Sequence, residues 1–179
     1  MSNFSFLSPD DIPNMIELQA AVVESLRLKG QEHFIIARET SYFEKHVQNP
    51  STILGVRSSE GTLIAQSIFH HSDTLNPDYI KGLTLDDWKL CDPVSTLQGV
   101  IIHPDAQGQG ISSRMVDAWI GWAQEKGYKH LLTRIEEHNS KSISSFKRAG
   151  LEDVGKIVDA RDGATVCVLH KTINHEKTA

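Results

Sequence analysis

The sequence of 179 residues has few features of secreted, membrane or nucleic-acid-binding proteins. Cysteine is scarce, with only Cys91 and Cys167, and residues 1–6 contain neither the basic segment nor the apolar core of a signal peptide. We therefore expect two reduced thiols and a cytoplasmic protein. No apolar run approaches the roughly 20 residues that cross a bilayer, so we expect no membrane partner.

Basic residues are also in the minority, because 18 Lys and Arg stand against 23 Asp and Glu and give a formal net charge of −5. A nucleic-acid-binding domain usually carries a basic patch, so we expect no nucleic-acid partner. The nine histidines show none of the short His-x-x-x-His spacings with a nearby acid that hold zinc. We therefore expect no metal.

The most informative segment is residues 97–113. Residues 100–102 form an apolar run that predicts a buried strand, and residues 103–105 end it with a proline and a turn-favouring aspartate. Downstream, apolar residues recur at the spacing of one helix face, at Ile111, Met115, Ala118, Trp119 and Trp122. The pattern predicts a strand, a glycine-containing loop and a helix, and the free N–H groups at such a helix start favour phosphate.

This loop can be compared with two general phosphate-binding patterns. A P-loop ends in Gly-Lys-Ser/Thr, and residues 107–113 contain no lysine. The dinucleotide-binding loop needs a third glycine where Ser113 stands and an acidic residue about 20 positions on, where His130 stands. An ordinary connection between a strand and a helix is the non-functional interpretation.

The segment Gln107-x-x-Gly110-x-Ser112 resembles the pyrophosphate loop of the GNAT superfamily, the acetyl-CoA-dependent N-acyltransferases, which reads Gln/Arg-x-x-Gly-x-Gly/Ala. Ser112 departs from the usual Gly or Ala, but serine is small and adds a hydroxyl donor. A second segment, residues 139–151, is similar to the family's Asn-x-x-Ala-x-x-x-Tyr-x-x-x-Gly-Phe. There Phe146 stands where the family often has a tyrosine that protonates the departing CoA thiolate.

The substitution at Phe146 leaves several possibilities, because phenylalanine has no proton to give. Another group protonates the thiolate, or the thiolate leaves toward water, or catalysis is weak. A plain core aromatic is the structural alternative for the same residue.

The resemblance implies acetyl-CoA as acyl donor. The Val100 N–H would face the acyl oxygen, and the Ile102 main chain would pair with pantetheine. Asn139 would bind the pantetheine arm near the sulfur, beside Phe146. The pyrophosphate would lie on a loop that begins at Gln107 and continues through Gly108, Gln109, Gly110, Ile111, Ser112 and Ser113. Candidates for the 3′-phosphate are Lys141, Lys147 and Arg148.

The general base remains open among three residues and a chain of water molecules. Glu136 and His138 lie at the end of a predicted strand beside the expected cofactor, and His71 ends another strand. Histidine titrates near neutrality and suits the removal of a proton from an amine.

We predict one domain over residues 1–179, with residues 172–179 as a frayed tail. The fold class is α/β (α+β), with a mixed, splayed central sheet of about seven strands and helices on both faces, as in the family. The expected strands after the first, which includes Phe4 and Phe6, are 52–57, 63–69, 97–102, 130–136, 153–160 and 164–171. The first expected helix begins at Ser8, and the other expected helices cover 42–47, 111–126 and 140–148. By resemblance, strands 97–102 and 130–136 splay apart around acetyl-CoA.

The sequence therefore predicts an N-acetyltransferase that moves an acetyl group to a primary amine by direct transfer in a ternary complex. A small-molecule amine is favoured over a protein by the single small domain and by the aromatic and acidic residues of 72–93. A non-catalytic acyl-CoA-binding or sensor protein, or an interaction module, is the alternative. The resemblance also allows a homodimer. Residues 34–36, Phe-Ile-Ile, are expected in the core rather than in a substrate cleft.

Overall fold

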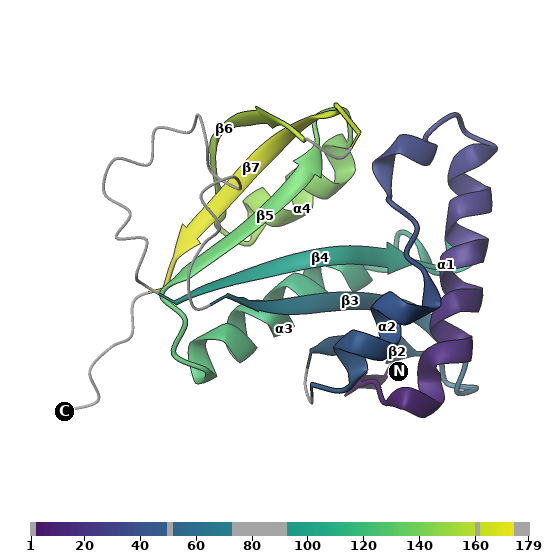
Figure 1. Cartoon of the computed structure of the whole chain (residues 1–179). Helices are drawn as coiled ribbons and strands as arrows, with labels where there is room; N and C mark the ends of the chain where they lie inside the picture. Colours follow the sequence, from purple (N-terminus) through teal and green to yellow (C-terminus); the bar gives the residue numbers. More distant parts are fainter. Residues whose placement is uncertain (1–2, 50–51, 73–92, 160–161, 174–179) are drawn as a thin grey trace. The chain divides into compact units, whose positions relative to one another are not determined.

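The computed structural model describes residues 3–49, 52–72, 93–159 and 162–173. The chain, coloured from its N-terminus to its C-terminus in Figure 1, divides into two compact units. The first unit comprises Met1–Phe69 and Gln98–Met115, and the second comprises His70–Leu97 and Val116–Ala179. Among the described residues, no helix is long and apolar enough to cross a bilayer.

The order of strands and longer helices is the predicted one. The elements are β1 Asn3–Phe6, α1 Ile12–Arg27, α2 Thr40–Val47, β2 Ile53–Arg57, β3 Leu63–Ser72, β4 Val94–Ile102, α3 Ile111–Glu125, β5 His130–Glu136, α4 Ser140–Arg148, β6 Glu152–Val158 and β7 Thr165–Thr172. The seven strands form one sheet in the order β1-β2-β3-β4-β5-β7-β6. Among the described strand pairs, β4 and β5 run parallel, whereas β1 with β2, β2 with β3, β5 with β7 and β6 with β7 run antiparallel. The sheet is therefore mixed, as predicted.

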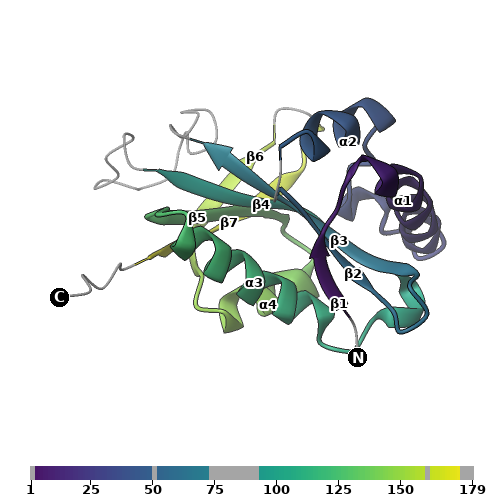
Figure 2. The same ribbon diagram turned by 90° about the horizontal axis from the view of Figure 1, so that it is seen from below.

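The first unit is built from the antiparallel strands β1, β2 and β3 with α1 and α2 packed on them (Figure 2). The Ser8 N–H and hydroxyl donate to Asp11 Oδ2 at 2.8 and 3.0 Å, which closes the turn that leads into α1. The apolar face of α1 is buried with that of α2 in one cluster, which contains Met15, Leu18, Val22, Phe43, Val47, Ile53, Leu63, Ile68 and Ile101. A helix face with this periodicity is amphipathic, and its burial anchors both helices.

The prediction for residues 34–36 is only partly correct. Ile35 packs against the first unit's core and Phe34 is half-buried, but the Ile36 side chain remains 37% exposed. The short 3-10 turn Glu32–Phe34 rotates the side chains, so consecutive apolar residues cannot all point inward.

In the second unit, β5, β7 and β6 form an antiparallel group, and α4 contacts β7 (Figure 1). Val94, Leu132 and Val168 form one apolar cluster of this unit. The strand β7 extends to Thr172, and the Ile173 N–H donates to Lys129 O at 2.8 Å, so residues 172 and 173 are not part of a tail. Residues 174–179 and most of the 72–93 connection lie outside the described residues.

Candidate active site

The predicted phosphate loop follows β4 through a short 3-10 turn, Pro104–Ala106. The His103 N–H donates to Ile64 O on the neighbouring strand at 2.8 Å. His103 Nδ1 in turn accepts from the Asp105 N–H at 3.3 Å. These bonds fix the direction in which the chain leaves the sheet.

Two glycines shape the loop itself. Gly108 has φ +81° and Gly110 has φ +72°, both in the left-handed region that side chains disfavour. A Cβ atom at either position would meet nothing within 4 Å, so the backbone conformation, and not crowding, explains glycine here. Residues 107–110 are exposed, so the loop's backbone is open to a ligand.

The helix α3 begins directly after the loop and is held by its apolar face. Ile111 is 1% and Met115 is 0% exposed, and both pack with Val56, Ala65 and Ala106. The first turn of a helix leaves N–H groups without partners inside the helix, and the helix dipole adds positive potential there. An exposed glycine loop before a firmly anchored helix start is a suitable site for a phosphate group.

The two glutamines of the loop brace its backbone. Gln107 Nε2 donates to Ile102 O, and Gln109 Nε2 donates to Asp105 O, each at 3.4 Å. Gln107 therefore lies at the entry of the loop, where its contact with the end of β4 holds the two together.

Sequence reasoning missed Gly99, which lies inside β4 with φ +58°. A left-handed residue within a strand disturbs the regular ladder and turns the neighbouring backbone groups. Gly99 immediately precedes Val100, whose N–H is the predicted donor to the acyl oxygen. A single glycine in an apolar run was the available signal.

The parallel pairing of β4 with β5 covers the first residues of both strands. The paired residues are Val94 with His130, Ser95 with Leu131, and Thr96 with Leu132. Next, Thr133 Oγ1 donates to Leu97 O at 3.0 Å, so a side chain satisfies that carbonyl. The predicted roles of Val100 and Ile102, on the later part of β4, remain predictions.

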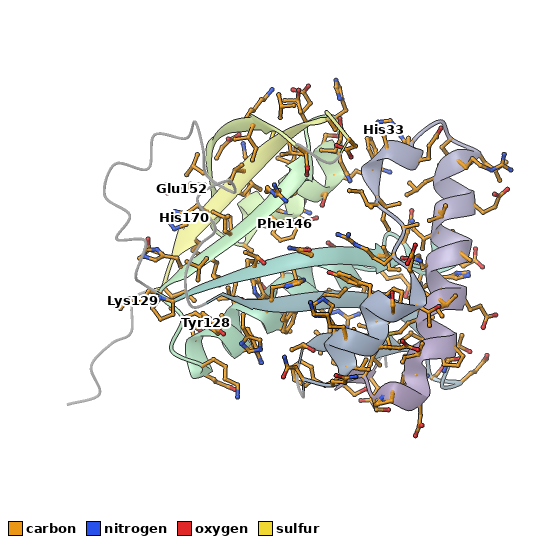
Figure 3. The ribbon with its side chains drawn as sticks, viewed as in Figure 1. His33, Tyr128, Lys129, Phe146, Glu152 and His170 are labelled. Atoms are coloured by element: carbon orange, nitrogen blue, oxygen red, sulfur yellow. The ribbon has the colours of Figure 1, made fainter. Side chains whose placement is uncertain are left out.

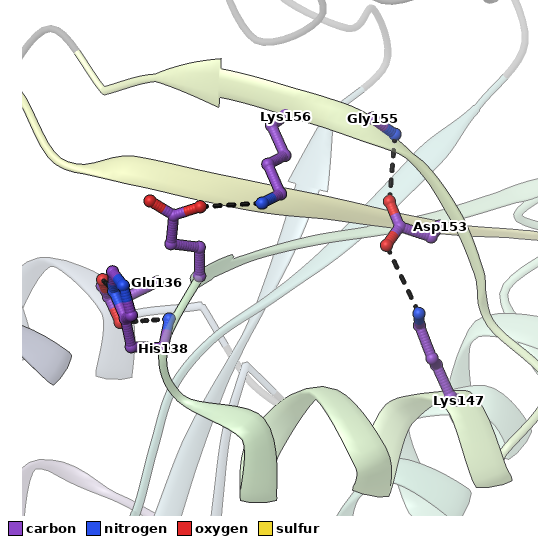
Figure 4. Close-up of polar contacts among 7 residues, drawn as sticks. Glu136, His138, Lys147, Asp153, Gly155 and Lys156 are labelled. Atoms are coloured by element: carbon purple, nitrogen blue, oxygen red, sulfur yellow. Dashed lines mark hydrogen bonds and ion pairs between the residues drawn. The ribbon is translucent and has the colours of Figure 1, made fainter.

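Two of the candidate bases contact each other at the end of β5 (Figure 4). The His138 N–H donates to Glu136 Oε2 at 2.8 Å, and His138 Nδ1 lies 2.8 Å from Glu136 Oε1. The Glu136 side chain is 10% exposed, whereas that of His138 is 73% exposed. The hydrogen bond that the imidazolium donates to Glu136, together with the charge of that carboxylate, raises the pKa of His138 above its ordinary value. With Nδ1 held by Glu136, Nε2 is the ring nitrogen available for proton transfer.

Glu137, which stands between Glu136 and His138 in the sequence, forms an ion pair with Lys156. Glu137 Oε2 lies 2.7 Å from Lys156 Nζ on β6, and this hydrogen bond lowers the pKa of Glu137 (Figure 4). Lys147, a candidate for the 3′-phosphate, lies 3.3 Å from Asp153 Oδ2. Arg148 donates to Ser145 Oγ at 3.4 Å.

Asn139 caps the start of α4 and Phe146 lies within it, and their surroundings differ. Asn139 Oδ1 accepts from the Ser142 N–H at 3.2 Å and caps the helix. Phe146, which Figure 3 labels, is 2% exposed. It packs edge-on against Trp119, with ring centroids 6.4 Å apart. These contacts are those of a core aromatic. A contact of either residue with a cofactor remains a prediction.

The third candidate base, His71, has aromatic neighbours. Its Nδ1 is hydrogen-bonded to the hydroxyl of Tyr128, and its ring lies edge-on to Trp122 with centroids 4.9 Å apart. Tyr128 stacks on Trp122 with centroids 5.5 Å apart. These partners lie at the end of α3 and just after it, whereas the phosphate loop precedes the first turn of that helix.

Comparison with known proteins gives one family. The model of the acetyltransferase (GNAT) family matches residues 20–151. A search of the curated proteins found no match.

Solved structures share the fold over nearly the whole chain. An acetyltransferase of the GNAT family from Streptococcus agalactiae has a TM-score of 0.77 at 12% identity, covering 97% of this chain and 96% of that one. The ribosomal-protein-S18-alanine N-acetyltransferase of Escherichia coli has a TM-score of 0.68 at 14% identity, covering 100% and 99%. NAA60 of Arabidopsis thaliana, solved with acetyl-CoA, has a TM-score of 0.71 at 11% identity, covering 98% and 100%. At these identities the likeness is one of fold.

Proposed function

Because the chain belongs to the acetyltransferase (GNAT) family and is therefore an acyltransferase, we propose that it transfers an acetyl group from acetyl-CoA to a primary amine. The transfer is direct and takes place in a ternary complex. The observation that carries this proposal is the exposed loop with left-handed Gly108 and Gly110 ahead of α3. The family match runs through both units of the chain, so in this proposal they form one catalytic domain.

The cofactor is held mainly by the backbone in this proposal. The pyrophosphate lies on the amides of residues 108–113, with Gln107 at the entry, and the main chain of Ile102 pairs with pantetheine. Such a site needs no excess of basic side chains, which suits a chain with a net charge of −5. The Asn139 amide group binds the pantetheine arm. Lys141 is the preferred partner of the 3′-phosphate, because it is exposed and has no ion pair among the described residues.

Glu136 and His138 act as an oriented base in this proposal. The amine nitrogen attacks the acetyl carbon, which the Val100 N–H polarises through the carbonyl oxygen. The new C–N bond forms, the C–S bond breaks, and the amine proton moves to His138 Nε2. The CoA thiolate leaves and takes a proton from water, because Phe146 has none to give. Glu136 stabilises the imidazolium and is a positioning residue.

A small-molecule amine is the proposed acceptor, on the grounds given by the sequence. A protein N-terminus is the second candidate, since one structural neighbour is an N-acetyltransferase of the alanine of ribosomal protein S18. A panel of primary amines and of peptides with free N-termini separates the two. Release of CoA would be followed with a thiol reagent.

The first experiment measures acetyl-CoA binding by calorimetry and by the shift in the unfolding midpoint. A ligand at 100 times its Kd stabilises the folded protein by about 2.7 kcal/mol, which gives a clear shift. Binding followed by turnover of any amine supports the proposal. Binding without turnover over the whole panel would favour the sensor interpretation, and no binding would exclude acetyl-CoA as the cofactor.

A further inference from the structure

Gln66 is a buried polar residue of β3 that the proposed mechanism does not use. Gln66 is only 2% exposed, and among the described residues its Oε1 atom has no hydrogen-bond partner. Gly55 stands opposite Gln66 in the register of β2 and β3. A Cβ atom on Gly55 would lie 2.4 Å from Leu7 Cδ2 and 3.0 Å from Leu63 Cδ1, so two leucine side chains lie over Gly55. Directly opposite residues of an antiparallel pair share one face, so the Gln66 side chain lies on the face on which these leucines cover Gly55.

A second buried glutamine of the same unit shows what a structural role looks like. Gln19 on α1 is 9% exposed, and both ends of its carboxamide are paired with the Arg38 backbone. Gln19 Nε2 donates to Arg38 O, and Arg38 N–H donates to Gln19 Oε1, each at 2.8 Å. An unpaired buried carbonyl destabilises the fold, and native proteins rarely retain one without reason. The difference between the two glutamines indicates that Gln66 Oε1 serves a group outside the described residues.

The position of Gln66 points to the reacting end of the substrate. Ile68 lies two residues further along β3 and therefore on the same face as Gln66. A Cβ atom on Gly99 would lie 3.7 Å from Ile68 Cδ1. Along β3, Gln66 is thus about 7 Å from Ile68, the residue that faces Gly99. Gly99 is adjacent to Val100, the proposed donor to the acyl oxygen.

We infer that Gln66 Oε1 accepts a hydrogen bond from the N–H of the acceptor amine. This inference rests on the proposed function, because it places the acyl group at Val100. A carboxamide takes no proton at neutral pH, so Gln66 orients the nitrogen lone pair and does not act as the base. Leu7 and Leu63, which lie over Gly55, and Ile68, which shares the face of Gln66, are apolar. We therefore expect the acceptor to carry its primary amine on an apolar body.

The test compares Gln66→Met with Gln19→Met, because methionine has nearly the shape of glutamine and cannot form these hydrogen bonds. The measurements are the unfolding midpoint, the Kd of acetyl-CoA, and kcat/KM for 2-phenylethylamine and for ethanolamine. We expect Gln66→Met to unfold at the same or a higher temperature and to bind acetyl-CoA within about twofold of wild type. Its kcat/KM for 2-phenylethylamine should fall about tenfold, the size expected for one lost hydrogen bond. Gln19→Met should instead unfold at a lower temperature.

Each other outcome overturns a different statement. If wild type binds acetyl-CoA but does not acetylate 2-phenylethylamine, or prefers ethanolamine, the apolar acceptor and the role of Gln66 are both wrong. If Gln66→Met keeps its kcat/KM, or loses stability as Gln19→Met does, the carboxamide is structural. If wild type binds no acetyl-CoA, the proposed function itself fails, and with it the acyl position on which Gln66 depends.

Discussion

The loop before α3 and the end of β5 use different parts of the chain for chemistry. At the loop, Gly108 and Gly110 hold the backbone in left-handed conformations, and the binding groups are amides. At the end of β5, the reactive groups are the side chains of Glu136 and His138, which are 2.8 Å apart. Backbone amides keep their charge distribution at every pH, whereas a carboxylate and an imidazole change theirs. Binding at the loop should therefore depend on conformation, and proton transfer at the end of β5 should depend on pH.

The largest expected effect comes from Gly110→Asp. The new carboxylate would stand where a phosphate is expected, on a residue with φ +72°. We expect the Kd for acetyl-CoA to rise by at least about 100-fold, or roughly 2.7 kcal/mol. Calorimetry measures the Kd directly.

Gly127→Asp is the matched control. Gly127 has φ +78° and equally open surroundings, but it follows α3 instead of preceding it. Both variants should lose a similar, small amount of stability, because aspartate tolerates the left-handed region. If the two variants bind acetyl-CoA equally well, the loop is not the phosphate site.

Replacing His138 tests whether proton transfer depends on the side chains at the end of β5. Loss of a general base lowers the rate of the chemical step, and we expect His138→Gln to lower kcat by about 100-fold. The Kd for acetyl-CoA should stay within about twofold, since no backbone amide changes.

His71→Gln separates the competing candidates. It removes the hydrogen bond to the Tyr128 hydroxyl, so we expect it to lower the unfolding midpoint while kcat stays near that of wild type. A large fall of kcat in His71→Gln, with little change in His138→Gln, would transfer the base to β3.

Most of the fold could be predicted from the sequence because its signals are local. The bounds of β5, His130–Glu136, and of α4, Ser140–Arg148, agree with the predicted ranges to the residue. The start of β4 was missed, because Ser95 and Thr96 interrupt its apolar pattern. Both are buried, and Ser95 Oγ accepts from Trp119 Nε1 at 2.8 Å, a contact that only the folded chain supplies.

The site could be predicted only where the backbone defines it. Glycines and a helix start leave a recognisable spacing, so the loop at 107–113 stood out. The base did not, because three titratable residues lay near strand ends and nothing local distinguished them. The contact of Glu136 with His138, the aromatic neighbours of His71 and the burial of Phe146 depend on tertiary packing. Nothing in the sequence indicated that Gln66 has a function, because a single glutamine in a strand becomes informative only when its burial is known.

A smaller effect concerns stability in the β5–β7 region. His170, which Figure 3 labels, has its Nε2 atom 3.3 Å from His130 Nδ1. Burial, and to a smaller extent the nearby His130, lowers the pKa of His170 to about 4. An unfolded histidine titrates near 6.5, so between these values the unfolded chain binds more protons. Stability is therefore fully present above about pH 6.5 and is lost as the pH falls toward 4. The ceiling is roughly 3 kcal/mol, and less because the side chain retains some solvent contact.

His170→Gln should flatten this dependence. Urea unfolding at pH 7.0, 5.5 and 4.5 gives the free energy of unfolding of each protein, and the loss on acidification should be smaller in the variant. His33→Gln, which changes an exposed histidine of the first unit, should follow wild type. Parallel curves for all three proteins would show that His170 does not contribute.

The smallest effect sharpens the role of Glu136. Its hydrogen bond and charge raise the pKa of His138, so the acid limb of the pH profile of kcat/KM should lie above pH 6.5. Glu136→Gln keeps an acceptor beside Nδ1 but removes the charge, so the limb should move to lower pH while the plateau stays within about fivefold. Glu137→Gln removes a charge that raises the same pKa more weakly, so it should move the limb in the same direction by less. An unmoved limb in Glu136→Gln would mean that the titrating base is not His138, and the proton would then leave through water.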